Sequence, residues 1–429
     1  MGRYRSVSIL AGFLFLPFLL FAQFNNNTSS PYSRYGLGDL QPYSFGRTSA
    51  MGGASIASRN GQQINLANPA SYTAVDSLGF MFEFGIYGNF SKLSTNETSL
   101  DANDINFRYF AMNFQITNWL GTSMGLLPYS DVGYNVEIQE EIPTAGNILH
   151  RYYGEGSLSK AYLGFAVAPV KNLSVGANLN YLFGMLHRNS EVYFPTAGNF
   201  YQNQKFESLR LRDFSLSFGA QATVPLSESR KIILAATIEN PTYTGFFSDM
   251  RNKYISLPQG NQSITDSKLD TISFQNKLDV EFPLTYGVGF SYVKENKLEI
   301  NADYYYQKWS DTNLPGSSGG NLTDLNKFAL GAEWIPDRFS IRSFLSRMAY
   351  RAGVKYEKSY LQLDGQQIND FGISFGVGLP VYRSNSTINL SAEIGKRGTK
   401  QHNLVQENYA RLNLSVNLYD LWFIQRRFE

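Results

Sequence analysis

Apolar and polar residues alternate with a period of two through most of the chain from about residue 78 onward. In the segment TYGVGFSYV (285–293), the three aromatic side chains and Val288 fall on one face, and the Thr, Gly and Ser residues fall on the other. This period predicts β-strands, because successive side chains of a strand point to opposite faces of a sheet. The same alternation recurs at 298–307, 373–379, 387–394 and 411–418.

The alternation and the turn signals between its segments predict about 14 strands, an even number as bacterial single-chain barrels have. Three long connectors, at 189–207, 247–282 and 310–324, are rich in Asn, Gln, Ser and Gly. They are predicted to be extracellular loops, because the periplasmic turns of such barrels are short. The predicted strands are 78–90, 104–117, 120–136, 157–169, 172–188, 208–225, 230–246, 283–294, 297–309, 325–335, 347–357, 369–379, 386–395 and 408–418.

A soluble β-sandwich also alternates, with its apolar face turned inward. Two features favour a membrane barrel instead. The polar faces carry Asn, Ser, Gly, Asp and Glu with few Lys, as a barrel lumen would, and Trp119, Trp309, Trp334 and Trp422 lie near predicted strand ends, where an aromatic girdle belongs. Only helices or closed barrels satisfy the backbone in lipid, and no apolar run after Ala22 is long enough for a spanning helix. The predicted fold is all-β, a 14-stranded antiparallel transmembrane barrel.

The first 22 residues have the pattern of a signal peptide: Arg3 and Arg5, an apolar run from Ile9 to Phe21, and a cleavage site after Ala22. An uncleaved anchor is the alternative. The absence of cysteine excludes a lipid-modified signal, disulfides and thiolate metal sites. An exported chain without cysteine fits the bacterial envelope, which places the barrel in a Gram-negative outer membrane.

Composition supports this picture. Tyr (28) and Phe (32) are abundant, and charged residues make up only 17% of the chain. The net charge of +2 gives no reason to expect nucleic acid as a partner. The segment SAMGGASIASRNGQQINLANPASYTAV (49–75) differs from the rest because it is rich in small residues and has no sustained period.

With these features, the chain resembles the outer-membrane long-chain fatty acid transporter (FadL-like) family of hydrophobic-compound channels, over essentially the whole mature chain. The motifs that carry the resemblance are Met51-Gly52-Gly53-Ala54, Asn68-Pro69-Ala70, the strand pair from Pro283 to Ser310, YRAGVKYEKS (350–359) and DFGISFGVGLP (370–380).

The resemblance implies a barrel plugged by an N-terminal hatch of about residues 24–76. Small residues suit a plug, because Gly and Ala let the backbone approach the wall closely. A stopper without any gating role is the alternative. The implied domains are an N-terminal extension and hatch (23–76), a barrel (77–420) and a periplasmic tail (421–429). The candidate plug and gate residues are Met51, Gly52, Gly53, Asn68, Pro69 and Ala70.

The resemblance also implies a kinked third strand that faces the Asn-Pro-Ala segment. Pro128 lies in the middle of the predicted third strand and Gly133 follows it. Proline interrupts a ladder of backbone hydrogen bonds, so these two residues are the candidate lateral kink. An ordinary strand end at Pro128 is the alternative.

The chain also departs from the family pattern at both ends. A long polar lead (25–47) precedes the core of the hatch, and the sequence LYDLWFIQRRFE continues past the last strand with Arg426 and Arg427. Either extension could contact a protein partner in the periplasm or the membrane.

Enzyme signatures are weak. The segment 372–376 matches G-x-S-x-G, but it lies inside an alternating strand, with Ser374 on the lumen face, rather than at a strand-to-helix turn. The three His residues (150, 187 and 402) are far apart, so neither a metal nor a cofactor is expected. Glu299, Asp303 and Glu393 are predicted to face the lumen and its water.

Two functions remain in view. The first, which the resemblance favours, is passive uptake of a hydrophobic or amphipathic small molecule, such as a fatty acid, with release sideways into the bilayer. Sideways release avoids rehydrating the solute, which costs about 0.8 kcal/mol per methylene. The alternative is a FadL-like barrel that serves as a structural or accessory subunit of an outer-membrane secretion or barrel-assembly complex.

Overall fold

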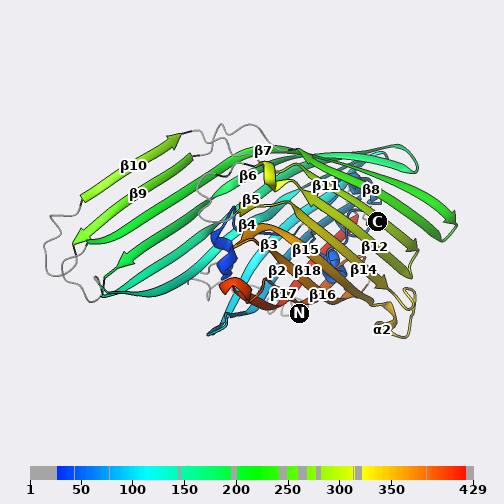
Figure 1. The fold of residues 1–429 in the computed structure, drawn as a ribbon. Coiled ribbons are helices and arrows are strands. Elements are labelled where there is room, and N and C mark those ends of the chain that lie inside the picture. Colours follow the sequence, from blue (N-terminus) through cyan, green and yellow to red (C-terminus); the bar gives the residue numbers. More distant parts are fainter. Residues whose placement is uncertain are drawn as a thin grey trace, which may run out of the picture.

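The chain forms a closed antiparallel β-barrel with a large sheet extension at one end (Figure 1). The computed structural model describes residues 27–42, 44–76, 78–143, 146–194, 201–240, 249–258, 268–276, 282–312, 314, 321–382 and 384–421. The predicted signal peptide (1–22) and nearly all of the predicted tail (421–429) lie outside these ranges. No helix among the described residues combines the length and the apolarity that crossing a membrane requires.

Fourteen strands make up the barrel wall. Each pairs antiparallel with its neighbours, β8 pairs with β11 across the long connector, and β18 pairs with β2 to close the ring. The wall strands are β2 (Gly79–Ser94), β3 (Ser99–Thr117), β4 (Leu120–Ile142), β5 (Gly146–Val170), β6 (Leu173–Tyr193), β7 (Tyr201–Ser227), β8 (Arg230–Asn240), β11 (Thr285–Lys294), β12 (Leu298–Gln307), β14 (Leu325–Trp334), β15 (Ala349–Leu363), β16 (Gln366–Pro380), β17 (Thr387–Arg397) and β18 (Gln406–Leu421).

These strands correspond one for one to the predicted spans, so the predicted all-β fold and strand number are confirmed. Four further short strands join the sheet without closing the ring: β1 (Asp39–Leu40), β9 (Asp249–Pro258), β10 (Lys268–Asn276) and β13 (Asn321–Leu322). The described helices are all short: η2 (Pro31–Arg34), η3 (Gly46–Met51), η4 (Pro69–Ala74), η7 (Trp309–Asp311), α2 (Phe344–Arg347) and η8 (Gln401–Asn403).

Two of the predicted loops are wrong in part. The connector 247–282 contains the hairpin β9–β10, and β9 pairs with the first half of β7. The connector 189–207 is largely the continuation of β6 and β7, which pair with each other as far as Val192 and Asn203. Polar strands exposed to water on both faces carry little apolar alternation, so the sequence pattern does not distinguish them from loops.

Inward and outward faces of the wall differ sharply in polarity. On β12, Glu299, Asn301 and Asp303 are buried on the inner face, and on β11 the outward Tyr286, Val288 and Phe290 are exposed. An apolar outer band over a polar interior is the arrangement of a transmembrane barrel of the bacterial outer-membrane type, in which lipid covers the band.

The aromatic girdle is confirmed at two of the predicted positions. Trp119 and Trp334 are 56% and 50% exposed at the short-turn end of the barrel, and the ring of Trp334 lies 5.9 Å from that of Tyr350. The assignment of Trp309 to the girdle is wrong, because it is fully buried, donates Nε1–H to Gln307 Oε1 at 2.9 Å and packs on Tyr360. Trp422 lies outside the described residues.

The two ends of the barrel have different connections. At one end, tight turns join β3 to β4, β5 to β6 and β7 to β8, whereas the other end carries the long strands and the β9–β10 hairpin. Since periplasmic turns are short, the first end faces the periplasm. The start of β2 and the end of β18 pair there, Gly79 opposite Leu421.

Candidate functional site

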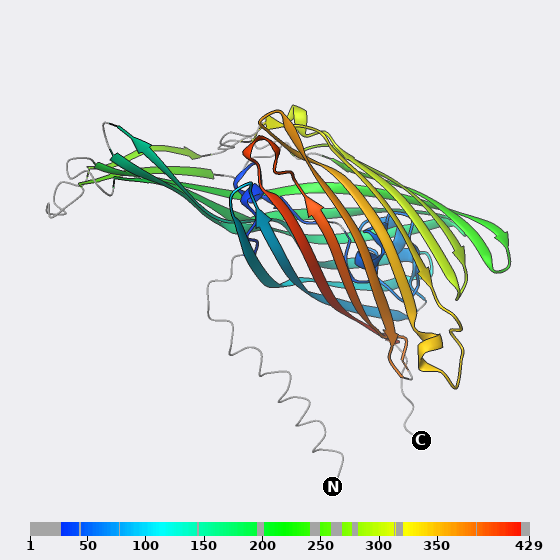
Figure 2. The same ribbon diagram turned by 60° about the horizontal axis from the view of Figure 1, so that its bottom comes forward.

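Residues 27–76 of the N-terminal segment contact the inner side of the wall around much of the ring. The short helix η3 touches β14 to β17, whereas η4 touches β4 to β7 on the other side. In Figure 2 this blue segment is visible between the near and far walls. Backbone contact at so many strands requires small residues on both sides, which is why Gly and Ala are frequent in residues 49–75.

Met51, Gly52 and Gly53 lie against β14, β15 and β16. Gly52 caps η3 in the left-handed region, with φ of 65°, and its N–H donates to the Ser374 Oγ at 2.8 Å. Ser374, the centre of the G-x-S-x-G match, is therefore a hydrogen-bond acceptor for this segment inside β16. The backbone of Met51 and Gly52 also lies directly on Gly353 of β15.

Replacing Gly353 with Ala is expected to weaken this contact. A Cβ built there would lie 2.2 Å from both the Gly52 nitrogen and the Met51 carbonyl carbon, so the segment would have to move away. Overpacking of this kind costs about 1–3 kcal/mol. Faster amide exchange at 49–54 and a lower urea midpoint would show it, and Gly88→Ala is the matched control because its nearest neighbour lies 3.4 Å away. Equal behaviour of the two variants would contradict the prediction.

A buried ion-pair network joins η3 to the wall. The Arg47 guanidinium pairs with Glu299 of β12 and with Glu333 of β14, at 2.9 Å for the second, and Arg351 of β15 also binds Glu333 at 2.6 Å. Burial by itself would lower the pKa of Arg47, but the two carboxylates raise that pKa above its ordinary value. Arg47 therefore stays charged and fixes η3 to two strands, β12 and β14.

The expectation that Glu299, Asp303 and Glu393 face lumen water is wrong for the first two, whereas Glu393 lines the polar cavity of the lumen. Asp303 accepts hydrogen bonds from the backbone N–H groups of Ser55 and Ile56, and Glu299 accepts from the Ser58 hydroxyl at 2.8 Å. Glu393 pairs with Lys355 and Arg411, at 2.7 and 3.2 Å. The sequence places these carboxylates on the inner face correctly, but their partners come from distant segments.

Asn68, Pro69 and Ala70 form the start of η4. The Asn68 side chain caps it by accepting from the Ala70 N–H at 3.0 Å, and Pro69 occupies the first helical turn, where a missing N–H costs nothing. The tripeptide lies on β6 and β7, where Gly176 and Gly219 leave room for it.

Arg59 ties this part of the segment to the same wall. Its guanidinium donates to the carbonyl oxygen of Ala70 and to the side-chain oxygens of Thr73, Ser174 and Gln221, at 2.9–3.2 Å. Burial among these uncharged acceptors lowers the pKa of Arg59 to about 10, so the group remains a cation at neutral pH.

Pro128 and Gly133 both lie inside β4, which runs unbroken to Ile142. The pairing of β4 with β5 shifts register between Pro128 and Ser130, as at a β-bulge. On the other edge, the ladder between β3 and β4 ends at the pair Phe110–Leu126, and beyond it the two strands no longer pair with each other. We call this gap in the ladder the seam.

The seam begins within the lipid-facing band. On β3, Ile105 and Phe107 lie beyond the last pair and are still exposed on the outer face. A second bulge lies beside it, since the pairing of β3 with β2 skips Arg108. The β2–β3 and β4–β5 ladders thus each have a bulge next to the point where the β3–β4 ladder ends, near Pro128.

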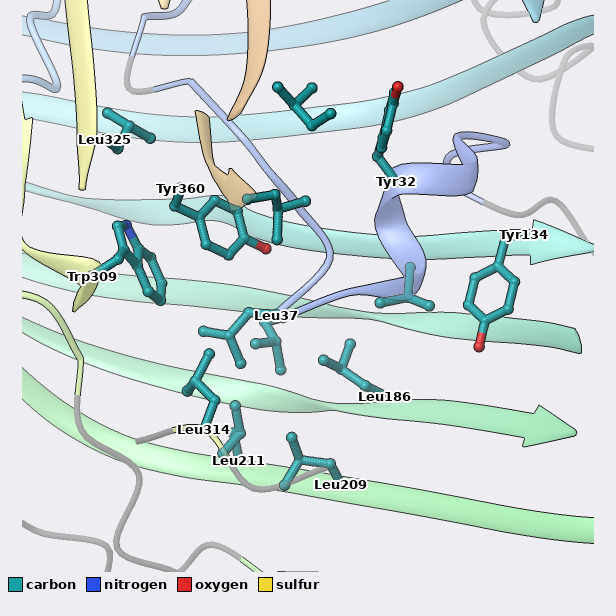
Figure 3. Packing of buried hydrophobic residues seen from close by; sticks show 14 of the residues in the cluster. Tyr32, Leu37, Tyr134, Leu186, Leu209, Leu211, Trp309, Leu314, Leu325 and Tyr360 are labelled. Atoms are coloured by element: carbon teal, nitrogen blue, oxygen red, sulfur yellow. The ribbon is translucent and has the colours of Figure 1, made fainter. Parts of the chain in front are cut away.

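The extracellular half of the lumen is filled by an apolar cluster (Figure 3). Tyr32 and Leu37 of the N-terminal segment are 2% and 0% exposed there, between side chains of β4 to β7 on one side and Trp309 and Tyr360 on the other. Fully burying a large apolar side chain contributes about 1.5–3 kcal/mol, so this cluster holds the segment firmly.

One cavity in the lumen is lined largely by polar and charged side chains. This cavity, of about 120 Å³, lies between the N-terminal segment and the wall, and Arg108, Lys355, Glu393, Arg397 and Arg411 are among its lining residues. By contrast, an apolar hollow lined by Ile86, Phe90 and Leu412 lies on the outer, lipid-facing side of the wall. No group of acidic, His or Cys residues suited to a metal ion occurs among the described residues.

Comparison with known proteins identifies the family. Residues 5–429 match the sequence model of the family described as BamG. The chain belongs to the BamG family. No curated protein sequence has a significant match to it.

Several solved structures share the fold of this BamG-family barrel. The toluene transporter TbuX of Ralstonia pickettii is 14% identical, with a TM-score of 0.57 over 88% of this chain and 99% of the other. The toluene transporter TodX of Pseudomonas putida is 15% identical, with a TM-score of 0.55 over 90% and 100%. A FadL homologue of Pseudomonas aeruginosa is 9% identical, with the same TM-score and coverage. The resemblance to FadL-like barrels is confirmed at the level of the fold, and the compared proteins are transporters and channels rather than enzymes.

Proposed function

We propose that this BamG-family barrel is an accessory subunit of an outer-membrane protein-assembly or secretion complex. The observation that carries the proposal is the state of the lumen: Arg47 holds the N-terminal segment to β12 and β14, Arg59 holds it to β6 and β7, and charged side chains are among those that line the cavity beside it. A lumen filled in this way disfavours passage of a solute and leaves the outer surface of the barrel as the part that could contact other proteins.

A lumen that is occupied, and that contains buried ion pairs, disfavours passage of an apolar solute. Such a solute would have to displace the apolar cluster around Tyr32 and Leu37 and then cross a zone that contains Arg47, Glu299 and Glu333. Separating buried ion pairs costs several kcal/mol. Membership of the BamG family is compatible with the subunit role.

The second candidate is uptake of a hydrophobic compound with lateral release, and the seam favours it. The wall is unpaired between β3 and β4 within the apolar band, as a sideways exit would require. Structures described as toluene transporters share the fold. If the barrel is a transporter of this kind, the hydrophobic compound enters the bilayer through the seam and does not pass the whole length of the lumen.

Two measurements separate the candidates. The affinity-tagged full chain is extracted from outer membranes in mild detergent, and its mass and composition are determined. In parallel, cells depleted of the chain are examined for folded outer-membrane barrels, which resist unfolding in unheated gels, and for uptake of radiolabelled toluene and oleate.

The subunit role predicts a complex of fixed stoichiometry and fewer folded barrels after depletion, with uptake unchanged. A monomer that carries a bound apolar molecule, together with uptake that falls in proportion to the chain, would overturn the subunit role in favour of transport.

A further inference from the structure

The connection between β14 and β15 is unusually long for the periplasmic end of the barrel. The other connections at this end have two to six residues between the bounds of their strands, whereas this one has 14, residues 335–348, and contains α2. We call it the basic loop. In Figure 2 it projects beyond the ends of the neighbouring strands. Because periplasmic turns in such barrels are short, joining two adjacent strands does not require a loop of this length.

The basic loop is held together by its own hydrogen bonds. The Asp337 N–H donates to the Ser346 carbonyl oxygen at 2.9 Å, and Asp337 Oδ1 accepts from the Phe339 N–H at 3.1 Å. The Ser343 hydroxyl oxygen caps α2 by accepting from the Ser346 N–H at 3.2 Å. The exposure of the side chains on this loop is therefore set by a hydrogen-bonded conformation.

Four large apolar side chains of the basic loop are exposed. Ile341 and Phe339 are 96% and 75% exposed, and Phe344 and Leu345 of α2 are exposed as well. A group of large apolar side chains that the protein itself does not cover marks a site of contact with a membrane or with another molecule. The apolar half of the loop therefore has no partner within the part of the chain that the structure describes.

Three arginines stand among these apolar side chains, against a single Asp. Arg338 donates to the Gln62 side chain, and Arg342 is exposed. The Arg347 guanidinium lies 5.7 Å from the centre of the Phe344 ring, and its Nε–H has no acceptor among the described residues. None of the three arginines takes part in an ion pair of the described residues. The loop thus presents positive charge and apolar surface together.

The basic loop is continuous with the lipid-facing surface of the wall. It begins directly after Trp334 of the aromatic girdle and ends just before Tyr350, whose ring lies 5.9 Å from that of Trp334. Tyr350 points outward, because the next residue, Arg351, points into the lumen. The Tyr350 hydroxyl donates to the Leu345 carbonyl oxygen at 3.1 Å, so α2 rests on the girdle. Girdle residues lie at the level of the lipid headgroups, which places the loop at the periplasmic surface of the membrane.

We propose that the basic loop docks on the periplasmic leaflet and binds anionic phospholipid there, with its apolar side chains in the headgroup region and with Arg342 and Arg347 on lipid phosphates. Continuity with the girdle favours lipid over a periplasmic protein as the occupant, and anionic headgroups complement the unpaired cations. The inference is independent of the proposed function, because an assembly subunit and a transporter would both carry such an anchor. Since Arg338 donates to Gln62, docking also holds one point of the N-terminal segment near the membrane surface.

Fluorescence quenching at a single site tests the docking. The chain has no native cysteine, and Ile341 is almost fully exposed, so Ile341→Cys gives one thiol for a bimane label without removing a buried contact. The labelled full chain is reconstituted in vesicles of phosphatidylcholine alone and in vesicles that also contain phosphatidylglycerol. Quenching is measured with iodide on both sides of the membrane, which reports exposure to water, and with lipids that carry a nitroxide on the headgroup, which report contact with lipid.

Phosphatidylglycerol is expected to protect the label from iodide and to increase its quenching by the nitroxide lipids. Adding Arg342→Gln and Arg347→Gln is expected to lower the ratio of docked to undocked loop about 30-fold, which corresponds to about 1 kcal/mol for each cation near an anionic surface. The matched control is Lys171→Gln with Arg230→Gln, which removes two exposed cations from short turns at the same end of the barrel. This control is expected to leave the ratio unchanged.

Three results would overturn the proposal. Strong iodide quenching in both kinds of vesicle, without an effect of the nitroxide lipids, would show that the loop stays in water. Protection from iodide in native outer membranes but not in the vesicles would assign the loop to a protein partner instead. Docking that does not depend on phosphatidylglycerol, or that both pairs of substitutions weaken equally, would show that the loop does not bind anionic lipid through Arg342 and Arg347.

Discussion

Replacing Arg47 with Met is expected to lower the free energy of unfolding by about 3–5 kcal/mol, the cost of removing one partner from a buried ion pair. The guanidinium is the only group of η3 that pairs with Glu299 and Glu333 among the described contacts. Without it, Arg351 still binds Glu333, but Glu299 loses its cation. Urea-induced unfolding of the detergent-solubilised protein, followed by Trp fluorescence, measures the change.

Arg338→Met is the control for Arg47→Met. Arg338 is half-buried near the periplasmic end and donates to the Gln62 side chain rather than to a carboxylate. Its loss is expected to cost about 1 kcal/mol or less. If both variants unfold at the same urea concentration as the unmodified protein, the network around Arg47 does not fix the N-terminal segment to the wall.

Deleting residues 49–70 is expected to convert an occluded barrel into a conducting one. The deletion removes the backbone that lies on β14 to β16 and on β6 and β7, together with the Ser55, Ile56 and Ser58 contacts to β12. A lumen of about 14 strands is wide enough to pass ions and small solutes once it is not filled. Planar-bilayer recordings should show stable open channels, and cells should become sensitive to large antibiotics.

The deletion variant must first be shown to insert correctly, by the mobility shift of the unheated protein in gels. Gly353→Ala provides an intermediate case: in the bilayer recordings this variant is expected to show brief channel openings rather than a permanently open channel. A correctly inserted deletion variant that conducts no better than the full chain would contradict the role of residues 49–70 as a plug.

The fold could be predicted well from the sequence because a membrane barrel repeats one local rule. Every wall strand has lipid on one side and polar groups on the other, so residues such as Tyr286 and Glu299 reveal their face by position alone. The hairpin β9–β10 was not predicted because it lies beyond the lipid-facing apolar band, where neither face of a strand has to be apolar. The position of Trp309 was predicted wrongly because an aromatic residue at a strand end can turn inward as well as outward.

The interior was harder to predict, since its contacts join residues far apart in the chain. Arg47 lies 252 and 286 positions from Glu299 and Glu333, and no local pattern connects them. Pro128 did give a local signal, and the interrupted ladder lies beside it. The residues that lie beside this gap, 27–41, could be recognised in the sequence only as a polar segment of unknown role. Their hydrogen bonds to β3 and β4 exist only once the wall has folded, so no local pattern predicts them.

The unequal strand lengths give the barrel a high side and a low side. β7 has 27 residues, which at about 3.3 Å per residue extend roughly 90 Å, whereas β11 and β12 have 10 residues each. With a tilt of about 40°, the tall strands rise roughly 70 Å, more than twice the hydrocarbon thickness of about 30 Å. On the extracellular side, β4 to β7 therefore extend well beyond the membrane, whereas β11 and β12 are much shorter. A protein that contacted this barrel above the membrane would therefore meet most of the wall surface on the side of β4 to β7.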